Sequence, residues 1–178
     1  MATVFTIGHS TRDLADFSRV LQTHGIRLLE DVRAFPMSRR YPHFNREKLE
    51  LWLPEIGCDY VWEKDLGGRR TRQMAPDQSP HVALRNPSFR NYADYMLSPQ
   101  FHQAIERLVE RSEKRNTVIM CAEYLYFRCH RMLVSDYLIS QGHTVLHILD
   151  DNPPTSHNLT QDARIVEGQL VYRGDYLL

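Results

Sequence analysis

The stretch of sequence that decides the fold is TVIMCAEYLYFRCHR, residues 117–131. Its first part, residues 117–120, is a short β-branched and apolar run that predicts a buried strand. A helical pattern of apolar residues begins at position 129 and ends near Gly142. A thiol and a carboxylate therefore follow the strand, and a thiol, an imidazole and a guanidinium begin the helix. Ligands bind at such junctions in open α/β sheets, so we expect a functional site here.

Strands and helices alternate along the rest of the chain. The predicted strands are residues 4–7, 27–32, 59–62, 117–120 and 144–149, and the predicted helices are residues 13–25, 45–57, 88–114 with an interruption at Ser98-Pro99, and 129–142. This alternation predicts an α/β fold, a three-layer α/β/α arrangement with a central, mainly parallel sheet of about five strands. Residues 1–178 are expected to form a single domain. In the tail, residues 151–178, two short runs around Glu167-Gly168 predict a hairpin.

The composition is that of a soluble globular protein, with 42% apolar and 25% charged residues. The formal net charge is zero, so no overall field attracts nucleic acid or an anionic membrane. No apolar run approaches the roughly 20 residues that a membrane-spanning helix needs. The first residues lack the features of a signal peptide, and the three cysteines have no disulfide-framework spacing. We therefore expect a cytoplasmic protein with no membrane partner.

Two predicted strands end in polar residues. Gly8-His9-Ser10 follows the first strand, where glycine lets the backbone approach a ligand and Ser10 offers an anion contact. The alternative is that Ser10 only caps the next helix and His9 fills space beside it. Asp31 and Arg33 end the second strand and face the same side of the sheet. They predict either a ligand contact or an internal salt bridge, and both can hold.

The third strand end carries two candidate catalytic groups, Cys121 and Glu123. A helix dipole and the nearby Arg128 or Arg131 are expected to lower the pKa of Cys121 and favour its thiolate. The spacing from Cys121 to Arg128 is one residue longer than the C-x5-R loop of phosphatases, and the loop lacks glycine. Because its bulky side chains poorly suit a thiol-centred anion cradle, the sequence slightly favours Glu123 over Cys121 as the catalytic group.

A metal site is a further interpretation of the same segment. Cys121, Cys129 and His130 are possible soft ligands, with Glu123 or His9 joining them. The adjacent Cys129 and His130 point in different directions on a helix, and no C-x2-C is present. Cys129 is equally well explained as a small buried apolar residue. We therefore assign no metal ligands, and the sequence specifies no cofactor and no oligomeric state.

Several of these motifs together resemble a known family. The chain is similar, over about residues 3–150, to the uncharacterised bacterial and archaeal family numbered 488 among domains of unknown function. The residues that carry the resemblance are Thr6-Ile7-Gly8-His9-Ser10, Asp31-Val32-Arg33 with Pro36 and Ser38, Leu66-Gly67-Gly68, Met120-Cys121-Ala122-Glu123 and Cys129-His130-Arg131. The resemblance implies an α/β fold and a site built from these residues, but no reaction. The chain departs from it at residues 124–128, where the side chains are bulky.

The leading hypothesis is an enzyme that acts on a phosphate-bearing substrate, a nucleotide or a nucleic acid. Its cleft is expected at the carboxyl ends of the first, second and fourth strands. The expected catalytic residues are Cys121, Glu123, His9 and Asp31, and the expected substrate-binding residues are Gly8, Ser10, Arg33, Cys129, His130 and Arg131. The Arg-rich loop 65–87 is a candidate lid or phosphate contact. The alternative is a nucleotide, nucleic-acid or metal binding module without turnover, which would not need Glu123.

Overall fold

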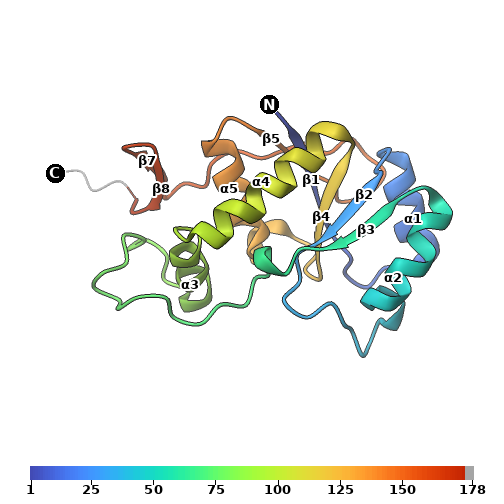
Figure 1. Ribbon diagram of the computed structural model, residues 1–178, viewed down its shortest axis with the longest axis horizontal. Coiled ribbons are helices and arrows are strands. Elements are labelled where there is room, and N and C mark those ends of the chain that lie inside the picture. Colours follow the sequence, from blue (N-terminus) through green and yellow to red (C-terminus); the bar gives the residue numbers. More distant parts are fainter. Residues whose placement is uncertain (175–178) are drawn as a thin grey trace.

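A six-stranded sheet in the order β3-β2-β4-β1-β5-β6 forms the centre of the molecule (Figure 1). The computed structural model describes residues 1–174. The strands are β1 (Thr3–Gly8), β2 (Leu28–Asp31), β3 (Asp59–Trp62), β4 (Thr117–Cys121), β5 (Thr144–His147) and β6 (Thr155–Ser156). The first five strands all pair in parallel with their neighbours, and β6 pairs antiparallel to β5. The five predicted strands are confirmed, and the tail adds the sixth.

Helices cover both faces of the sheet, which confirms the three-layer α/β/α prediction (Figure 1). One face carries α1 (Leu14–Thr23) and α2 (Arg46–Trp52), and the other carries α3 (Pro87–Tyr95), α4 (Pro99–Lys114) and α5 (Arg131–Ser140). Short 3-10 turns connect them at η1 (Pro42–Phe44), η2 (Leu53–Ile56), η3 (Lys64–Leu66) and η4 (Tyr126–Arg128). Within residues 1–174, no helix combines the length and apolarity that crossing a membrane requires.

The alternation of side chains along β4 decides which helical layer each residue meets. Val118 and Met120 pack in the core beneath α1 and α2, whereas Ile119 packs in the core beneath α4 and α5. Successive side chains of a strand point to opposite faces. Cys121 therefore lies on the same face as Ile119, where α5 begins.

The starts of three helices confirm some of the sequence predictions and contradict others. Asp13 caps α1 by accepting a backbone N–H of the first turn. Ser10, the cap we considered from sequence, instead has a positive φ of 50° and donates its N–H to the carbonyl of Ala122. Ser98 caps α4, which confirms the predicted interruption. α5 begins at Arg131 rather than at position 129, because the preceding residues form the irregular connection from η4.

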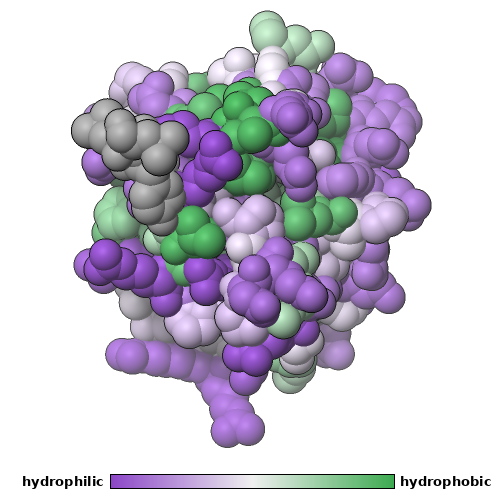
Figure 2. Space-filling view, turned by 90° about the vertical axis from the view of Figure 1, so that its left-hand side faces the viewer, coloured by the Kyte–Doolittle hydropathy of each residue, from purple (hydrophilic) through white to green (hydrophobic). Residues whose placement is uncertain are grey.

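The C-terminal segment forms the predicted hairpin, β7 (Ala163–Val166) and β8 (Gln169–Tyr172). Glu167 and Gly168 make its two-residue turn, both with positive φ, as a type I′ turn requires. Ala163, Leu170 and Tyr172 join the core on the α4 and α5 face. Figure 2 views the end of the molecule that carries this hairpin, where hydrophobic side chains lie in separate clusters among hydrophilic ones.

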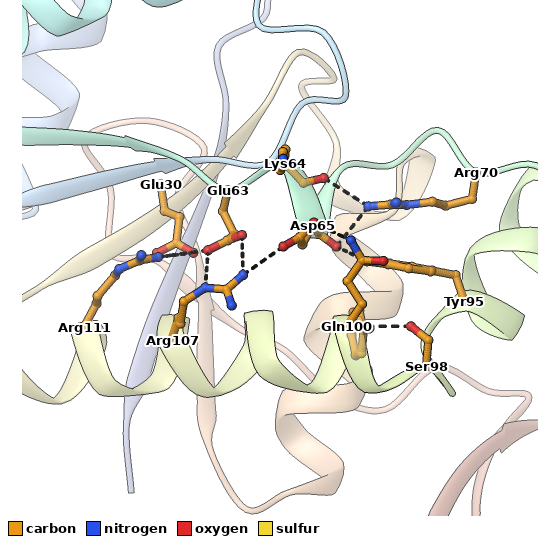
Figure 3. Close-up of polar contacts among 11 residues, drawn as sticks. Glu30, Glu63, Lys64, Asp65, Arg70, Tyr95, Ser98, Gln100, Arg107 and Arg111 are labelled. Atoms are coloured by element: carbon orange, nitrogen blue, oxygen red, sulfur yellow. Dashed lines mark hydrogen bonds and ion pairs between the residues drawn. The ribbon is translucent and has the colours of Figure 1, made fainter.

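An ion-pair network joins the sheet to α4 (Figure 3). Arg107 donates to both carboxylate oxygens of Glu63, at 3.0 and 2.8 Å, and to Asp65 at 3.1 Å. Arg111 lies 3.2 Å from a carboxylate oxygen of Glu63 and 3.2 Å from one of Glu30. Glu30 is fully buried in β2, and the only ion pair of its carboxylate within residues 1–174 is with Arg111, which Glu63 shares.

Glu30 is expected to make the stability of this protein fall as the pH rises. Burial and the negative charge of Glu63 raise the pKa of Glu30 from 4.5 to about 7. The folded state therefore binds this proton more tightly than the unfolded chain. The protonated Glu30 contributes its full stabilisation of the fold below about pH 4.5, and this contribution is lost as the pH rises through about 7. Glu30→Gln should raise the free energy of unfolding at pH 8 by up to about 3 kcal/mol. Urea unfolding between pH 5 and 8 measures this change.

Glu110 provides the control for the Glu30 experiment, because it is an exposed carboxylate on α4 that pairs with Lys114. Glu110→Gln should leave the pH profile of the unfolding free energy as it is in the unmodified protein. A Glu30→Gln variant with that same profile would show that the buried carboxylate is not the group that titrates.

Candidate functional site

The carboxyl ends of β1, β2 and β4 lie side by side, as the sequence predicted. Gly8 pairs with Cys121 in the parallel register, and the His9 N–H donates to the Cys121 carbonyl at 2.9 Å. A Cβ added at Gly8 would lie 1.8 Å from the carbonyl oxygen of Glu123. Glycine is therefore required at position 8 because the loop after β4 crosses directly over the end of β1.

The polar side chains at this edge form two clusters on opposite faces of the sheet. His9, Asp31 and Arg33 lie on the α1 and α2 face, where His9 stacks on Phe44. The cysteine cluster, which we define as Cys121, Cys129 and Arg131, lies on the α5 face. The sequence predicted that these residues share one cleft, but the alternation of side chains places them in two hydrogen-bonded groups on opposite faces of the sheet.

Asp31 and Arg33 form the internal salt bridge that the sequence allowed. Arg33 Nε donates to Asp31 Oδ1 at 2.9 Å and Nη2 donates to Oδ2 at 2.6 Å. Arg33 Nη2 also donates to the Phe44 carbonyl at 2.7 Å, and the Tyr60 hydroxyl donates to Asp31 Oδ2 at 2.7 Å. Both charged side chains are buried. Most donors of Arg33 are thus satisfied within the protein.

His9 is buried beside this salt bridge. Its Nδ1 lies 2.9 Å from the Ser10 carbonyl oxygen, and its Nε2 lies 3.4 Å from Arg33 Nη1. Because a carbonyl oxygen only accepts, Nδ1 carries the hydrogen and Nε2 is the acceptor. Burial, with a contribution from the Arg33 charge, lowers the pKa of His9 to about 4. His9 is therefore neutral at neutral pH.

The cysteine cluster places two sulfurs around one buried guanidinium. Cys121 Sγ and Cys129 Sγ are 3.2 Å apart. Arg131 Nε lies 2.9 Å from Cys121 Sγ and 3.3 Å from Cys129 Sγ, and the Arg131 backbone N–H lies 3.4 Å from Cys129 Sγ. Arg131 is only 1% exposed. A buried cation requires a nearby anion, and the thiols are the groups that provide it.

The two thiols differ in acidity. The hydrogen bond from the Cys121 thiol, followed by His130 and the Arg131 charge, holds the pKa of Cys129 well below its usual value. Burial and the Cys129 sulfur raise the pKa of Cys121 well above its usual value. The sequence predicted a lowered pKa for Cys121, and this prediction is wrong. Cys129 adjoins the N-terminus of α5 and accepts its N–H, whereas Cys121 is enclosed at the end of a central strand.

The Arg-rich loop closes over His130. A Cβ added at Gly68 would lie 2.3 Å from His130 Nδ1, so the Leu66-Gly67-Gly68 motif permits this close approach. The guanidinium of Arg70 lies 3.7 Å from the centre of the Tyr95 ring. It donates to the carbonyl oxygens of Lys64, Asp65 and Gly67. Arg70 therefore holds the loop in place rather than facing solvent as a phosphate contact.

The remaining predicted site residues lie at the edge of these clusters. The side chain of Glu123 is exposed, and its backbone carbonyl accepts a hydrogen bond from Arg131 Nη2. Ser10 is half-buried in the turn after β1. Over residues 1–174, no three His, Cys, Asp or Glu side chains are grouped so that they could hold a metal ion. On the α5 face of this edge, the two thiols and Arg131 are in direct contact with one another.

A chain of buried hydrogen bonds extends from Arg131 to Asp136, and the sequence analysis missed it. Arg131 Nη1 lies 3.4 Å from Thr6 Oγ1, which lies 2.7 Å from His147 Nδ1. His147 Nε2 lies 2.9 Å from His157 Nδ1, and His157 Nε2 lies 2.9 Å from Asp136 Oδ1. The sequence signals for this chain were polar residues in buried elements: Thr6 and His147 in strands, and Asp136 in a largely buried helix.

One arrangement of protons satisfies every bond in this chain. The Asp136 carboxylate only accepts, so His157 donates from Nε2 and accepts at Nδ1. His147 then donates from Nε2 and accepts the Thr6 hydroxyl at Nδ1. Burial, the neighbouring His157 and Arg131 lower the pKa of His147 to about 3, which agrees with a neutral ring. The Thr6 oxygen is thereby left to accept from Arg131, so Asp136 helps to orient the guanidinium that faces the thiols.

Comparison with known proteins identifies the family of this chain. A family model matches residues 13–138, a region that contains Asp31, Arg33 and the cysteine cluster. The match is shorter at both ends than the range of about 3–150 expected from sequence, and it begins after His9. No curated protein and no solved structure matches the chain. Because the family model matches more than half of the chain, the chain belongs to the family described as domain of unknown function DUF488.

Proposed function

We propose that the protein is an enzyme that uses a cysteine thiolate to act on a phosphate-bearing substrate, a nucleic acid rather than a free nucleotide. The observation that carries the proposal is the buried contact of Arg131 with the sulfurs of Cys121 and Cys129, at 2.9 and 3.3 Å. The Cys129 thiolate, stabilised by this guanidinium, is the nucleophile in this proposal, and it contacts Cys121 at the end of β4, where α/β folds bind ligands. Thiol chemistry is favoured over Glu123, whose side chain is exposed.

The loops around the cysteine cluster supply groups that bind nucleic acid. Five residues on these loops are exposed, and we call them the basic-aromatic rim: Phe35, Arg69, Tyr124, Phe127 and Arg128. The guanidinium of Arg69 lies over the Phe35 ring at 5.7 Å, so the loop after β2 and the Arg-rich loop meet here. Aromatic faces stack on unpaired bases, and arginines contact the phosphates between them. The rim therefore suits a single-stranded segment.

Arg33 and Arg131 have a different role in this proposal from the one that the sequence suggested. Arg33 binds Asp31, and Arg131 binds the two sulfurs and the carbonyl oxygen of Glu123. The phosphate contacts are assigned instead to the exposed arginines of the rim. We place the enzyme in the cytoplasm, where free thiols such as its three cysteines stay reduced.

Cys129 is expected to react with iodoacetamide faster than Cys58 at pH 7, because thiolates are the reactive form. Burial raises the pKa of Cys58 to about 12, so it provides an internal control. A bound single-stranded oligonucleotide should slow the alkylation of Cys129 several-fold without changing that of Cys58. Peptide mapping of the alkylated native protein measures both rates.

Arginine variants test whether the rim delivers the oligonucleotide. Replacing Arg69 and Arg128 together by alanine should reduce the slope of log Kd against log salt by about 1.4, the value for two phosphate contacts on a single strand. Arg115→Ala is the matched control, because Arg115 is also exposed but pairs with Asp59 at the opposite end of the sheet. Oligonucleotide binding that leaves Cys129 alkylation unchanged would support the binding-module alternative. No oligonucleotide binding at all would reject both the nucleic-acid enzyme and the nucleic-acid binding module.

A further inference from the structure

The two sulfurs of the cysteine cluster are close enough to bond with little movement. They are 3.2 Å apart, and both cysteines are free. A disulfide has an S–S length of about 2.05 Å, so the sulfurs need to approach by only about 1 Å. Cys121 is fixed in the central strand β4, whereas Cys129 lies in the connection between η4 and α5. Cys129 is itself buried, whereas the neighbouring Phe127 and Arg128 are exposed.

The environments of the two sulfurs assign them different roles. Cys129 accepts the N–H of Arg131 and contacts its guanidinium, which favours the thiolate that attacks an oxidant. Cys121 lies within hydrogen-bond distance of Cys129 as its thiol partner. A thiolate with an adjacent thiol is the arrangement in which a first oxidation product is captured as a disulfide. Arg131 lies beside both sulfurs, so the negative charge is stabilised until the attack.

We propose that Cys121 and Cys129 form a redox-active dithiol site that takes a hydroperoxide as its oxidant and closes to a disulfide. The inference goes beyond the proposed function, because it requires no phosphate-bearing substrate. It concerns a single oxidation of the protein, which a small-molecule dithiol reverses. Cys58 takes no part, since it lies in the core on the opposite face of the sheet.

The oxidation proceeds in two steps. The Cys129 thiolate attacks the terminal oxygen of the hydroperoxide, the O–O bond breaks, and the leaving alkoxide takes a proton from water to become an alcohol. Cys129 is then a sulfenic acid. The Cys121 sulfur attacks the Cys129 sulfur, the S–O bond breaks, and the hydroxide leaves as water with the Cys121 proton. Sulfur loses two electrons in total, and the peroxide oxygens gain them.

Mass spectrometry of the reduced full-length protein after one equivalent of hydrogen peroxide tests the proposal. We expect a loss of 2 Da, one peptide pair linked through Cys121 and Cys129, and an unmodified Cys58. Dithiothreitol should restore the original mass. Cys58→Ser should give the same loss, which shows that the reaction needs only the pair.

Two further variants separate the roles of the sulfurs. Cys121→Ser should stop at the sulfenic acid, a gain of 16 Da that dimedone traps at Cys129. In Cys129→Ser, peroxide should oxidise Cys121 at least tenfold more slowly than it oxidises Cys129 in the unmodified protein, because no stabilised thiolate remains. Circular dichroism confirms that each variant is folded. Equal oxidation of Cys58 and Cys129 in the unmodified protein, or accumulation of higher oxides without a disulfide, would overturn the proposal while leaving the oligonucleotide experiment unaffected.

Discussion

Replacing Arg131 by methionine is expected to destabilise the protein by about 3–5 kcal/mol, the cost of removing one partner from a buried ion pair. Methionine fills much of the volume but supplies no charge. The sulfurs of Cys121 and Cys129 lose their cation, and the Glu123 carbonyl loses the donor Arg131 Nη2. The pKa of Cys129 should rise at the same time. Urea unfolding under reducing conditions measures the first effect, and thiolate absorbance against pH measures the second.

Arg128→Met is the matched control for this experiment, since Arg128 is three residues away in η4 and exposed. Its replacement should change the unfolding free energy by less than about 0.5 kcal/mol, as is usual for surface substitutions. If the Arg131 and Arg128 variants unfold alike, the guanidinium of Arg131 does not balance a buried thiolate. The low pKa of Cys129 would then need another source.

Replacing Asp136 by alanine is expected to cost at least about 3 kcal/mol, because several buried donors lose their acceptor together. His157 Nε2 and the Thr160 N–H both donate to Asp136 Oδ1 at 2.9 Å. The hydroxyls of Thr160 and Tyr172 donate to Oδ2 at 2.8 and 2.9 Å. Without the Asp136 carboxylate, nothing fixes which ring nitrogens of His157 and His147 carry the hydrogens. Thermal and urea unfolding measure the stability.

The readout that separates positioning from simple packing is the alkylation rate of Cys129 against pH. If Asp136 orients Arg131 through the histidines and Thr6, the midpoint of that profile should move to higher pH in Asp136→Asn, which keeps the side-chain volume. Asp77→Ala, an exposed loop substitution, serves as the control for both measurements. A destabilised Asp136→Asn variant with an unchanged alkylation profile would limit the role of the chain to stability.

The sequence alone determined the strands, the helices and their layering. Strand and helix signals are local, because side-chain periodicity and turn residues act within a few positions. The interruption at Ser98-Pro99 and the hairpin at Glu167-Gly168 follow from backbone geometry that proline and glycine impose. The shared strand edge was also predictable, since parallel strands bring their carboxyl ends together. The strand ends that carry the candidate residues from Gly8 to Arg131 therefore lie side by side, as predicted.

Only the tertiary structure decided how those residues are grouped. One-residue differences in strand register place Asp31 and Arg33 on one face of the sheet and Cys121 on the other. The acidity of Cys129 depends on contacts with Cys121 and Arg131, and the distance between sulfurs eight residues apart depends on the path of the loop between them. The hydrogen-bonded chain to Asp136 joins residues separated by more than a hundred positions. Electrostatic and hydrogen-bond energies depend on such distances in space, which sequence patterns do not contain.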